Sequence, residues 1–492
     1  MLMTYTCTNG DQKRVWILQE AALPRTVVAQ CGFATLDVDV LLLGAMIYVR
    51  QQLVNNKMNL LPNSDAAHLL TELRYSNPDA KLLDLPDLLA ASRQAGSSEK
   101  RDNFYALYGL TTTDLSALGL RADYSAPVER ALVDATHALL KAQGNLNLLE
   151  LAEGQPRGGA VDIGELPSWV PAALGPAQYS PQFLNHNRRS QNLLCRAAAR
   201  SLYHDLPKKW TTDPATLPEK VFEDIAKRFT DLSTESKMST ALMPYLPVIE
   251  ELSFNVDKAD ALVVQGQIID KIEERSRSPT WSQRANEADD EDNMLVDKSI
   301  DSLHDFLRAL LDRDEMVERR LEKHKYPTGE SVLTAYRKTV CTGHELTNEK
   351  EAARGFNGVR QTIGALKMAD WVRGDRIDED SFPGMLFGVG AFALGGWAGK
   401  ISSMNANMSV WMLMRNSLNG RRLIWTEKGY LALVPEESKV GDSIVLVQGA
   451  RLPFIMRPKE SGWRLLGPSY VHGVVHDKSS SMDIAVEDIR VI

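Results

Sequence analysis

The stretch from Arg421 to Val475 constrains the fold most, because short apolar runs follow one another there at close spacing. Turn-forming residues separate these runs, among them Gly429, Gly441 and Gly449. Short apolar runs that are bounded by turn residues are typical of β-strands. We therefore predict five or six strands of a small antiparallel β unit, in the runs RRLIW, YLALV, SIVLV, LPFIM, GWRLL and YVHGVV.

Most of the remaining chain has helical patterns. Ser125 is a candidate N-cap for an amphipathic helix, Pro127 suits its first turn, and Gly144 its end. The sequence therefore predicts an α+β fold that is predominantly helical, with the antiparallel β module at its C-terminus. Other predicted elements are helices over 16–23, 36–53, 65–74 and 85–92, a strand through 27–28, and a helical region over 189–335.

Charge and cysteine usage narrow the possible partners and the compartment. The net charge is −8 and no long block of Lys and Arg occurs, which argues against nucleic acid or an anionic membrane surface as a partner. The four cysteines form no CxxC pair and no zinc-ligand spacing. We therefore expect free thiols in a reducing compartment, a cytoplasmic location and no metal site.

Two segments bear on membrane association. The first residues have no apolar core followed by a small-residue cleavage site, so no secretory signal is expected. Residues 382–399 carry no charge but are rich in glycine. A buried glycine-rich segment is the favoured interpretation of this stretch, and a membrane-spanning helix remains the alternative.

The standard catalytic and cofactor motifs are missing from this sequence. It contains no phosphate-binding loop, no nucleophile elbow and no zinc-protease motif. Gly388 to Ala393 loosely matches a dinucleotide fingerprint, but no acidic residue follows at the required distance. His472 and His476 on a predicted strand are expected to be structural. The sequence therefore implies no cofactor.

Trp16 and Glu20 form the local arrangement with the most chemical interest. Residues four apart on a helix lie on one face, so the indole and the carboxylate are predicted to be neighbours. A carboxylate beside an indole in a cleft could bind a ribose or stabilise a developing cation. The alternative, which composition favours, is that Trp16 packs in the core and Glu20 forms an ordinary surface ion pair.

Arg101 and Asp102 present the same choice. They precede the apolar residues of FYALYGL, so Asp102 could cap a helix or pair with a buried arginine. A structural role is the favoured interpretation for both residues.

Taken together, these segments resemble the fungal heterokaryon-incompatibility (HET) proteins. RVWILQEAAL is similar to the family's RxWxxQE motif, and SSEKRDNFYALYGL to its PRDxxYALLGL motif. DYS at 123–125 and LPSWVP at 166–171 match two further motifs. The tail is similar to the family's C-terminal module through Gly441 and Asp442, the strand containing Pro453, Phe454 and Arg457, and YVHG at 470–473.

One departure from the family pattern affects the predicted domains. HET domains begin with a strand and an IWIDAxCINQ-like segment, and neither precedes Arg14 here. The resemblance therefore implies an N-terminally truncated, TIR-like HET remnant. The predicted regions are the C-terminal part of the HET domain at 1–45, a helical region with HET motifs at 46–188, a variable helical region at 189–335 with an acidic linker at 276–297, and a C-terminal helix with the β module at 336–492.

The resemblance implies a role in non-self recognition and the associated cell-death signalling, through contacts with other proteins of that response. A degenerate interaction scaffold is one alternative. A TIR-like NAD glycohydrolase is another, with Glu20 as the catalytic carboxylate and Trp16 shaping the nucleotide pocket. A sheet edge exposed by the missing strands would favour self-association.

Overall fold

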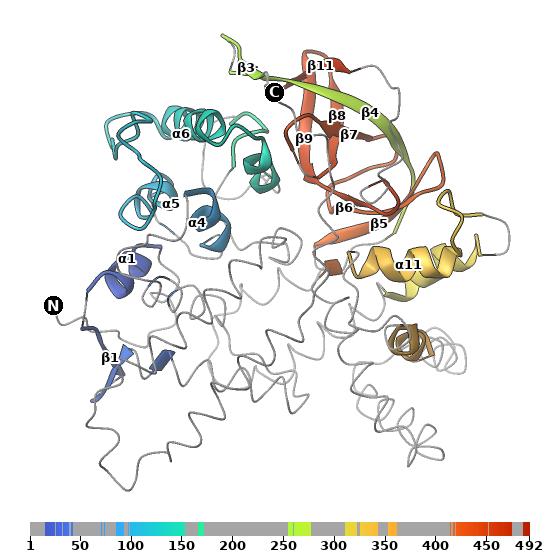
Figure 1. Ribbon diagram of the computed structural model, residues 1–492, viewed down its shortest axis with the longest axis horizontal. Helices are drawn as coiled ribbons and strands as arrows, with labels where there is room; N and C mark the ends of the chain where they lie inside the picture. The colour runs from blue at the N-terminus through green and yellow to red at the C-terminus, as the bar shows by residue number, and fades with distance from the viewer. Residues whose placement is uncertain are drawn as a thin grey trace, which may run out of the picture.

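The computed structural model describes the parts of the chain that form the elements in Figure 1. The described residues are 15–24, 26–31, 33–38, 41–42, 70, 73, 85–92, 97, 99–152, 166–171, 254–258, 260–276, 310–321, 325–342, 353–361, 414, 417–418, 420–450, 452–474 and 486–492.

The N-terminal part contains short helices and one hairpin. The sequence predicted a strand through 27–28 but no hairpin, and Leu36 and Asp37, which were placed in a helix over 36–53, lie in strand β2. The pair β1–β2 is antiparallel, with Val28 opposite Asp37. The longest helix, α6, ends at Gly144, whose φ of 61° suits glycine. Ser125 does not cap this helix, because its hydroxyl is bound to Asp123. The elements are α1 (Trp16–Ala22), β1 (Val28–Cys31), β2 (Ala34–Asp37), α4 (Leu85–Ala91), α5 (Asp102–Tyr105), α6 (Val128–Gln143) and the 3-10 helix η2 (Asn147–Leu151).

A nine-stranded mixed sheet forms the other half of the described structure. Five of its strands close into a ring, because each pairs with the next in the order β4, β11, β9, β8, β7 and β7 pairs again with β4 (Figure 1). A second layer, β5, β6 and β10, continues from the far end of β4. The strands are β3 (Phe254–Val256), β4 (Leu262–Arg275), β5 (Arg421–Thr426), β6 (Leu431–Pro435), β7 (Ser443–Val447), β8 (Phe454–Lys459), β9 (Gly462–Pro468), β10 (Tyr470–Val471) and β11 (Glu487–Val491).

Strand β4 belongs to both layers of this sheet. Its first residues pair with β11, its middle with β7 and its last residues with β5. The register shifts between Ile268 and Asp270 and again between Ile272 and Glu274. Such irregularities bend a strand and increase its twist. The bend lets one strand of 14 residues leave the ring and enter the second layer.

The two faces of the strands are buried against different partners. Side chains from all five ring strands join one core cluster, which continues into the N-terminal helices. The side chain of Ile424 in β5 packs on the side of the ring. The side chains of its neighbours Leu423 and Trp425 point to the opposite face of β5, where they pack against a second helical layer. That layer consists of α11 (Val332–Val340) and helical segments over 310–318 and 353–361. Burial on both faces explains why the strands are continuous apolar runs.

The prediction of a predominantly helical chain is wrong. Most of the helices among the described residues are short, and the nine-stranded mixed sheet is the dominant element. The error arose in the region 189–335, where LVVQGQIIDKIEER was interpreted as helix but forms β4. Its apolar residues alternate only in part, because the register shifts move them between faces. The sheet is also mixed, since β11 runs parallel to β9.

Several predicted features fall on residues outside the described ranges. These are the glycine-rich stretch at 382–399, all of the acidic linker except Ser276, the helix over 65–74 apart from its residues 70 and 73, His476 and the whole of region 189–253. Within the described ranges, no helix has the length and apolar character needed to cross a membrane.

Gly266 offers a test of the closed ring, because at this residue β4 pairs with β11 along one edge and with β7 along the other. A Cβ atom there would lie 2.6 Å from Ile489 Cδ1 and 2.9 Å from the Leu446 oxygen. We expect Gly266→Ala to destabilise the protein by about 1–3 kcal/mol, as overpacking does. Denaturant unfolding measures this change, and exposed Lys271→Ala on the same strand is the control. Equal stability of both variants would contradict the ring.

Candidate functional site

The structure places Trp16 and Glu20 on α1, as predicted, but in different surroundings. Trp16 is half-buried and packs against the main core cluster. Glu20 is exposed. The neighbouring Gln19 lies against Gly109, where its Nε2 atom is 2.6 Å from the position of an added Cβ. The RVWILQE and FYALYGL motifs therefore meet through Gln19 and Gly109, and a catalytic role for Glu20 remains a prediction.

Arg101 and Asp102 bind the DYS segment that follows them in the sequence. Arg101 Nη1 donates to the main-chain oxygens of Tyr124 and Ala126, at 2.8 and 2.6 Å. Its guanidinium lies 5.4 Å from the centre of the Tyr124 ring. The Tyr124 hydroxyl donates to Asp102 Oδ1 at 2.7 Å, and Tyr105 donates to the oxygen of Asp123. These residues fasten two motifs together, which confirms the structural interpretation.

The LPSWVP motif joins the N-terminal part to the ring. Trp169 is fully buried, and its Nε1 donates to the Asp260 oxygen at 2.9 Å, just before β4. The Ser168 hydroxyl donates to the oxygen of Ile492 and accepts from Leu465 N at 2.9 Å. This short motif thus contacts β9 itself and the residues that lie just before β4 and just after β11.

The motif residues Asp442, which is buried, and Arg457, which is partly buried, form an ion pair inside the β unit. Arg457 Nε and Nη2 each donate to Asp442 at 2.8 Å. Asp442 also accepts from Lys439 N at 2.7 Å, and Arg457 Nη2 donates to the Glu437 oxygen. The hydrogen bond to Asp442 holds the pKa of Arg457 above its usual value. The pair therefore closes the turn before β7 against β8.

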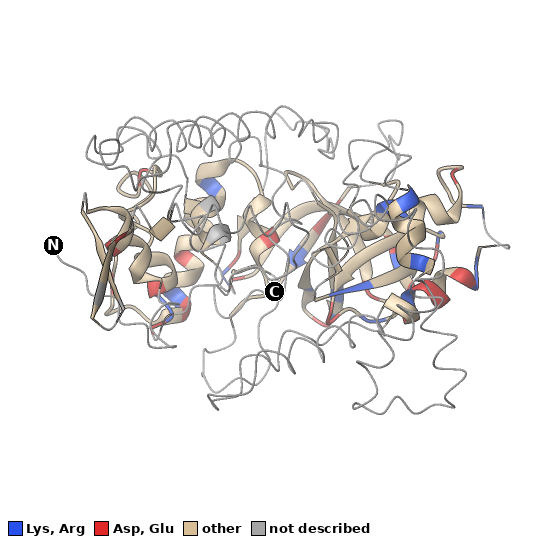
Figure 2. Cartoon of the chain, turned by 90° about the horizontal axis from the view of Figure 1, so that it is seen from below, with Lys and Arg blue, Asp and Glu red and all other residues tan. Residues whose placement is uncertain are grey.

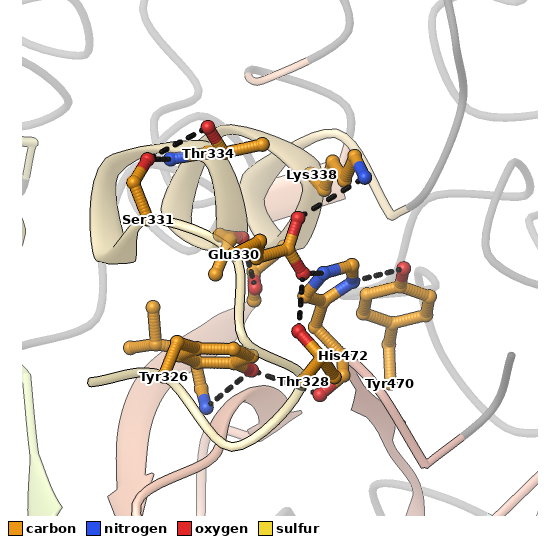
Figure 3. A network of polar contacts seen from close by, with 11 residues as sticks. Tyr326, Thr328, Glu330, Ser331, Thr334, Lys338, Tyr470 and His472 are labelled. Carbon is orange, nitrogen blue, oxygen red and sulfur yellow. Dashed lines mark hydrogen bonds and ion pairs between the residues drawn. The ribbon is translucent and has the colours of Figure 1, made fainter. Parts of the chain in front are cut away.

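His472, from the YVHG motif, is the centre of a network of polar contacts (Figure 3). Its side chain is only 5% exposed, and its Nε2 lies 2.5 Å from Glu330 Oε1. With Nε2 protonated, Nδ1 accepts from the Tyr470 hydroxyl at 3.3 Å. Lys338 Nζ lies 3.1 Å from the other oxygen of Glu330. The network therefore combines a carboxylate, an imidazole, a phenol and an ammonium group.

Tyr326 ties this network to the main chain of the sheet. Its hydroxyl donates to the His472 oxygen at 2.8 Å and accepts from Leu431 N at 3.0 Å. Glu330 lies one residue before Ser331, which caps α11 by accepting from Thr334 N (Figure 3). The network thus fixes the start of α11 against β6 and β10.

The electrostatics of the network favour a neutral imidazole beside an ionised carboxylate. Burial lowers the pKa of His472, and the contact with Glu330 only partly opposes this shift. Burial raises the pKa of Glu330, but its hydrogen bonds from His472, Thr328 and Lys338 outweigh this and hold it below its usual value. A buried histidine with two bound ring nitrogens can hold or transfer a proton, although its burial restricts access to solvent.

The sequence predicted only part of this network. His472 was predicted to be a structural histidine, which is confirmed. Tyr326, Glu330 and Lys338 were not identified, because they lie in a region without recognisable motifs. The signal available for Glu330 was local: Ser331 and the apolar residues after it mark a capped helix start. No group of metal-ligating side chains occurs within the described residues.

Charges of both signs are mixed over the described elements (Figure 2). Arg130 contacts both Asp134 and Asp260, and Arg320 contacts Glu273 and Glu274. The charges within each of these pairs offset one another locally.

Tyr124→Phe tests the fastening of the two N-terminal motifs. The change leaves the buried Asp102 without its 2.7 Å hydrogen bond from Tyr124, so we expect a loss of about 1–3 kcal/mol in unfolding free energy. Tyr108→Phe is the matched control, because the Tyr108 hydroxyl forms no hydrogen bond within the described residues. Denaturant unfolding that shows the two variants to be equally stable would contradict the fastening role.

His472 predicts a dependence of stability on pH. The pKa of His472 is lower in the folded state than its unfolded value of about 6.5. The stability that the neutral imidazole contributes is therefore fully present above about pH 6.5. It is lost as pH falls through the folded pKa, with a slope of at most about 1.4 kcal/mol per pH unit. His472→Gln should remove this slope in unfolding experiments between about pH 7.5 and 5. Burial also lowers the pKa of His137, whose own contribution to the slope stays the same in wild type and His472→Gln, so wild-type behaviour of His472→Gln would contradict this assignment.

In a comparison with protein families, residues 396–484 match the Het-6 beta-barrel domain. No curated protein matches the chain. No solved structure matches it either. The matched residues include β5 to β10, the Asp442–Arg457 pair and His472. The match supports a protein that is related to heterokaryon incompatibility and of fungal origin.

Proposed function

We propose that this chain acts in non-self recognition and the associated cell-death signalling, through contacts with other proteins. The match of residues 396–484 to the Het-6 beta-barrel domain carries this proposal. Arg101, Asp102, Ser168 and Arg457 bind other parts of the same fold, so these motif residues hold the structure that would present a contact surface.

The hairpin β1–β2 is the surface that we propose for such contacts. Phe33 in its turn is fully exposed, and Leu36 on β2 is 44% exposed. Leu23, after α1, is exposed as well. Exposed apolar side chains beside a short two-stranded sheet suit both a partner protein and a second copy of the chain. Contact with a second copy is the self-association that the sequence predicts.

Growth of a fungal cell that expresses the full chain tests the proposal. We expect wild-type expression to arrest growth, and Phe33→Asp to relieve the arrest at equal protein level. Val440→Asp is the matched control, because Val440 is an exposed apolar residue in a turn of the β unit. Normal growth with wild-type protein would contradict a signalling role and favour the pure scaffold.

The same experiment separates signalling by contact from the NAD glycohydrolase alternative. Glu20 is exposed on α1, so Glu20→Ala should leave the fold and the arrest unchanged if contacts carry the signal. Arrest that is lost in Glu20→Ala, together with loss of NAD turnover by the purified protein, would favour the enzyme.

A further inference from the structure

The hairpin of β1 and β2 has little core of its own. It lies at the end of the described structure that is away from the nine-stranded sheet (Figure 1). Among the described residues, its sheet consists of these two strands, and the buried cluster beneath it consists of Val27, Val38 and Leu42. A two-stranded sheet with so small an apolar core is marginally stable, and further strands with an apolar face would stabilise it.

Leu36 is an apolar side chain that this small core leaves uncovered. It lies opposite Ala29, and opposite residues of an antiparallel pair share one face of the sheet. Ala29 packs against the buried cluster, whereas Leu36 is 44% exposed. Thr35 and Asp37, which point to the other face, are exposed as well. Both faces of β2 are therefore open to solvent around Leu36.

The pairing within the hairpin determines which main-chain groups of β2 point outward. Val38 N donates to the Val27 oxygen at 3.0 Å, so these two residues form a hydrogen-bonded pair. Hydrogen-bonded and non-hydrogen-bonded pairs alternate along an antiparallel ladder, so Leu36 directs its main-chain groups towards β1. Thr35 and Asp37 direct theirs away from β1, towards the outer edge of the hairpin.

We propose that β2 pairs with β2 of a second copy of the chain, antiparallel and about a two-fold axis that passes between the two Leu36 residues. The inference names one partner for the hairpin surface of the proposed function and rests on that surface. In this register, Thr35 of each copy lies opposite Asp37 of the other, and the two residues exchange main-chain hydrogen bonds. The Thr35 hydroxyl can also donate to the opposite carboxylate. The two Leu36 side chains meet in the closely spaced, non-hydrogen-bonded pair, where each covers the other.

The charge and length of β2 select this register. Asp37 is the charged residue of the strand ATLD. An axis through Asp37 would place two carboxylates opposite each other, which destabilises a sheet. An axis through Thr35 would place Asp37 opposite Phe33, which lies in the turn before β2. A two-fold axis between the Leu36 residues avoids both faults, closes the assembly at two copies and gives a sheet of four strands.

Sedimentation equilibrium of the full chain over a range of concentrations tests the pairing. We expect the wild type to dimerise. Leu36→Asp should raise the dissociation constant of the dimer by about 100-fold or more, because it places two carboxylates opposite each other. Val440→Asp is the matched control, because it adds the same charge at an exposed apolar residue of the β unit, and it should dimerise like the wild type. A wild-type chain that stays monomeric, or an unchanged dissociation constant for Leu36→Asp, would overturn the proposal.

Cysteine cross-linking tests the register and does not require Leu36→Asp to fold. Under mild oxidation, Leu36→Cys should form more disulfide-linked dimer than the wild type, because the Cα atoms of a non-hydrogen-bonded pair are about 4.5 Å apart. Thr35→Cys should stay at the wild-type level, because its two copies lie diagonally, about 7–8 Å apart. A disulfide-linked dimer at position 35 alone, or at neither position, would exclude the proposed pairing.

Growth arrest of a fungal cell is an independent readout, so failure of the dimer and failure of the signalling role can be told apart. A chain that dimerises through Leu36 but leaves growth normal supports the pairing and contradicts the signalling role. A chain that arrests growth but sediments as a monomer supports the signalling role and overturns the pairing.

Discussion

The pairing of β4 with strands on both of its edges is the constraint on which the rest of the described structure depends. β11 and β7 hold its first half within the ring, and β5 holds its end within the second layer. Without β4 the ring would open, and the main-chain groups of β7 and β11 would lose their partners along one edge. The second layer would also lose its connection to the ring. The two faces of the strands are buried in different hydrophobic clusters, and this determines which helices cover each face of the sheet.

Polar contacts decide how the helices sit on this frame, because apolar packing is not directional. Ser168 and Trp169 fasten the N-terminal part near the start of β4 and beside β9. Tyr326 and the Glu330–His472 contact fasten α11 at the opposite side, beside β6. Each of these contacts binds main-chain atoms or a buried side chain, so a displaced helix would leave buried polar groups unpaired. The helices and the sheet are therefore coupled through a few specific atoms.

Local patterns predicted the elements that depend on neighbours in the sequence. The strands between Arg421 and Val471, the helix that ends at Gly144 and the short helix starting at Trp16 agree with the structure, whereas β11 was not predicted. Strand β4 was missed, because its side chains are buried by segments far away in the chain and its register shifts disturb the alternation. Glu330 was missed for a related reason: its partner His472 lies 142 residues further on. The sequence motifs identified one residue of each long-range contact. Its partner could be identified only from the three-dimensional structure.

The matched β-barrel domain is smaller than the physical unit that contains it. Residues 396–484 include β5 to β10, but the ring also needs β4 at 262–275 and β11 at 487–491. Three separate segments of the chain therefore build one hydrophobic core, which the N-terminal helices share. Any partner that contacts the helices acts on the same cooperative body as one that contacts the strands. In the proposed function, the packing of this one core would link a contact at the helices to the strands.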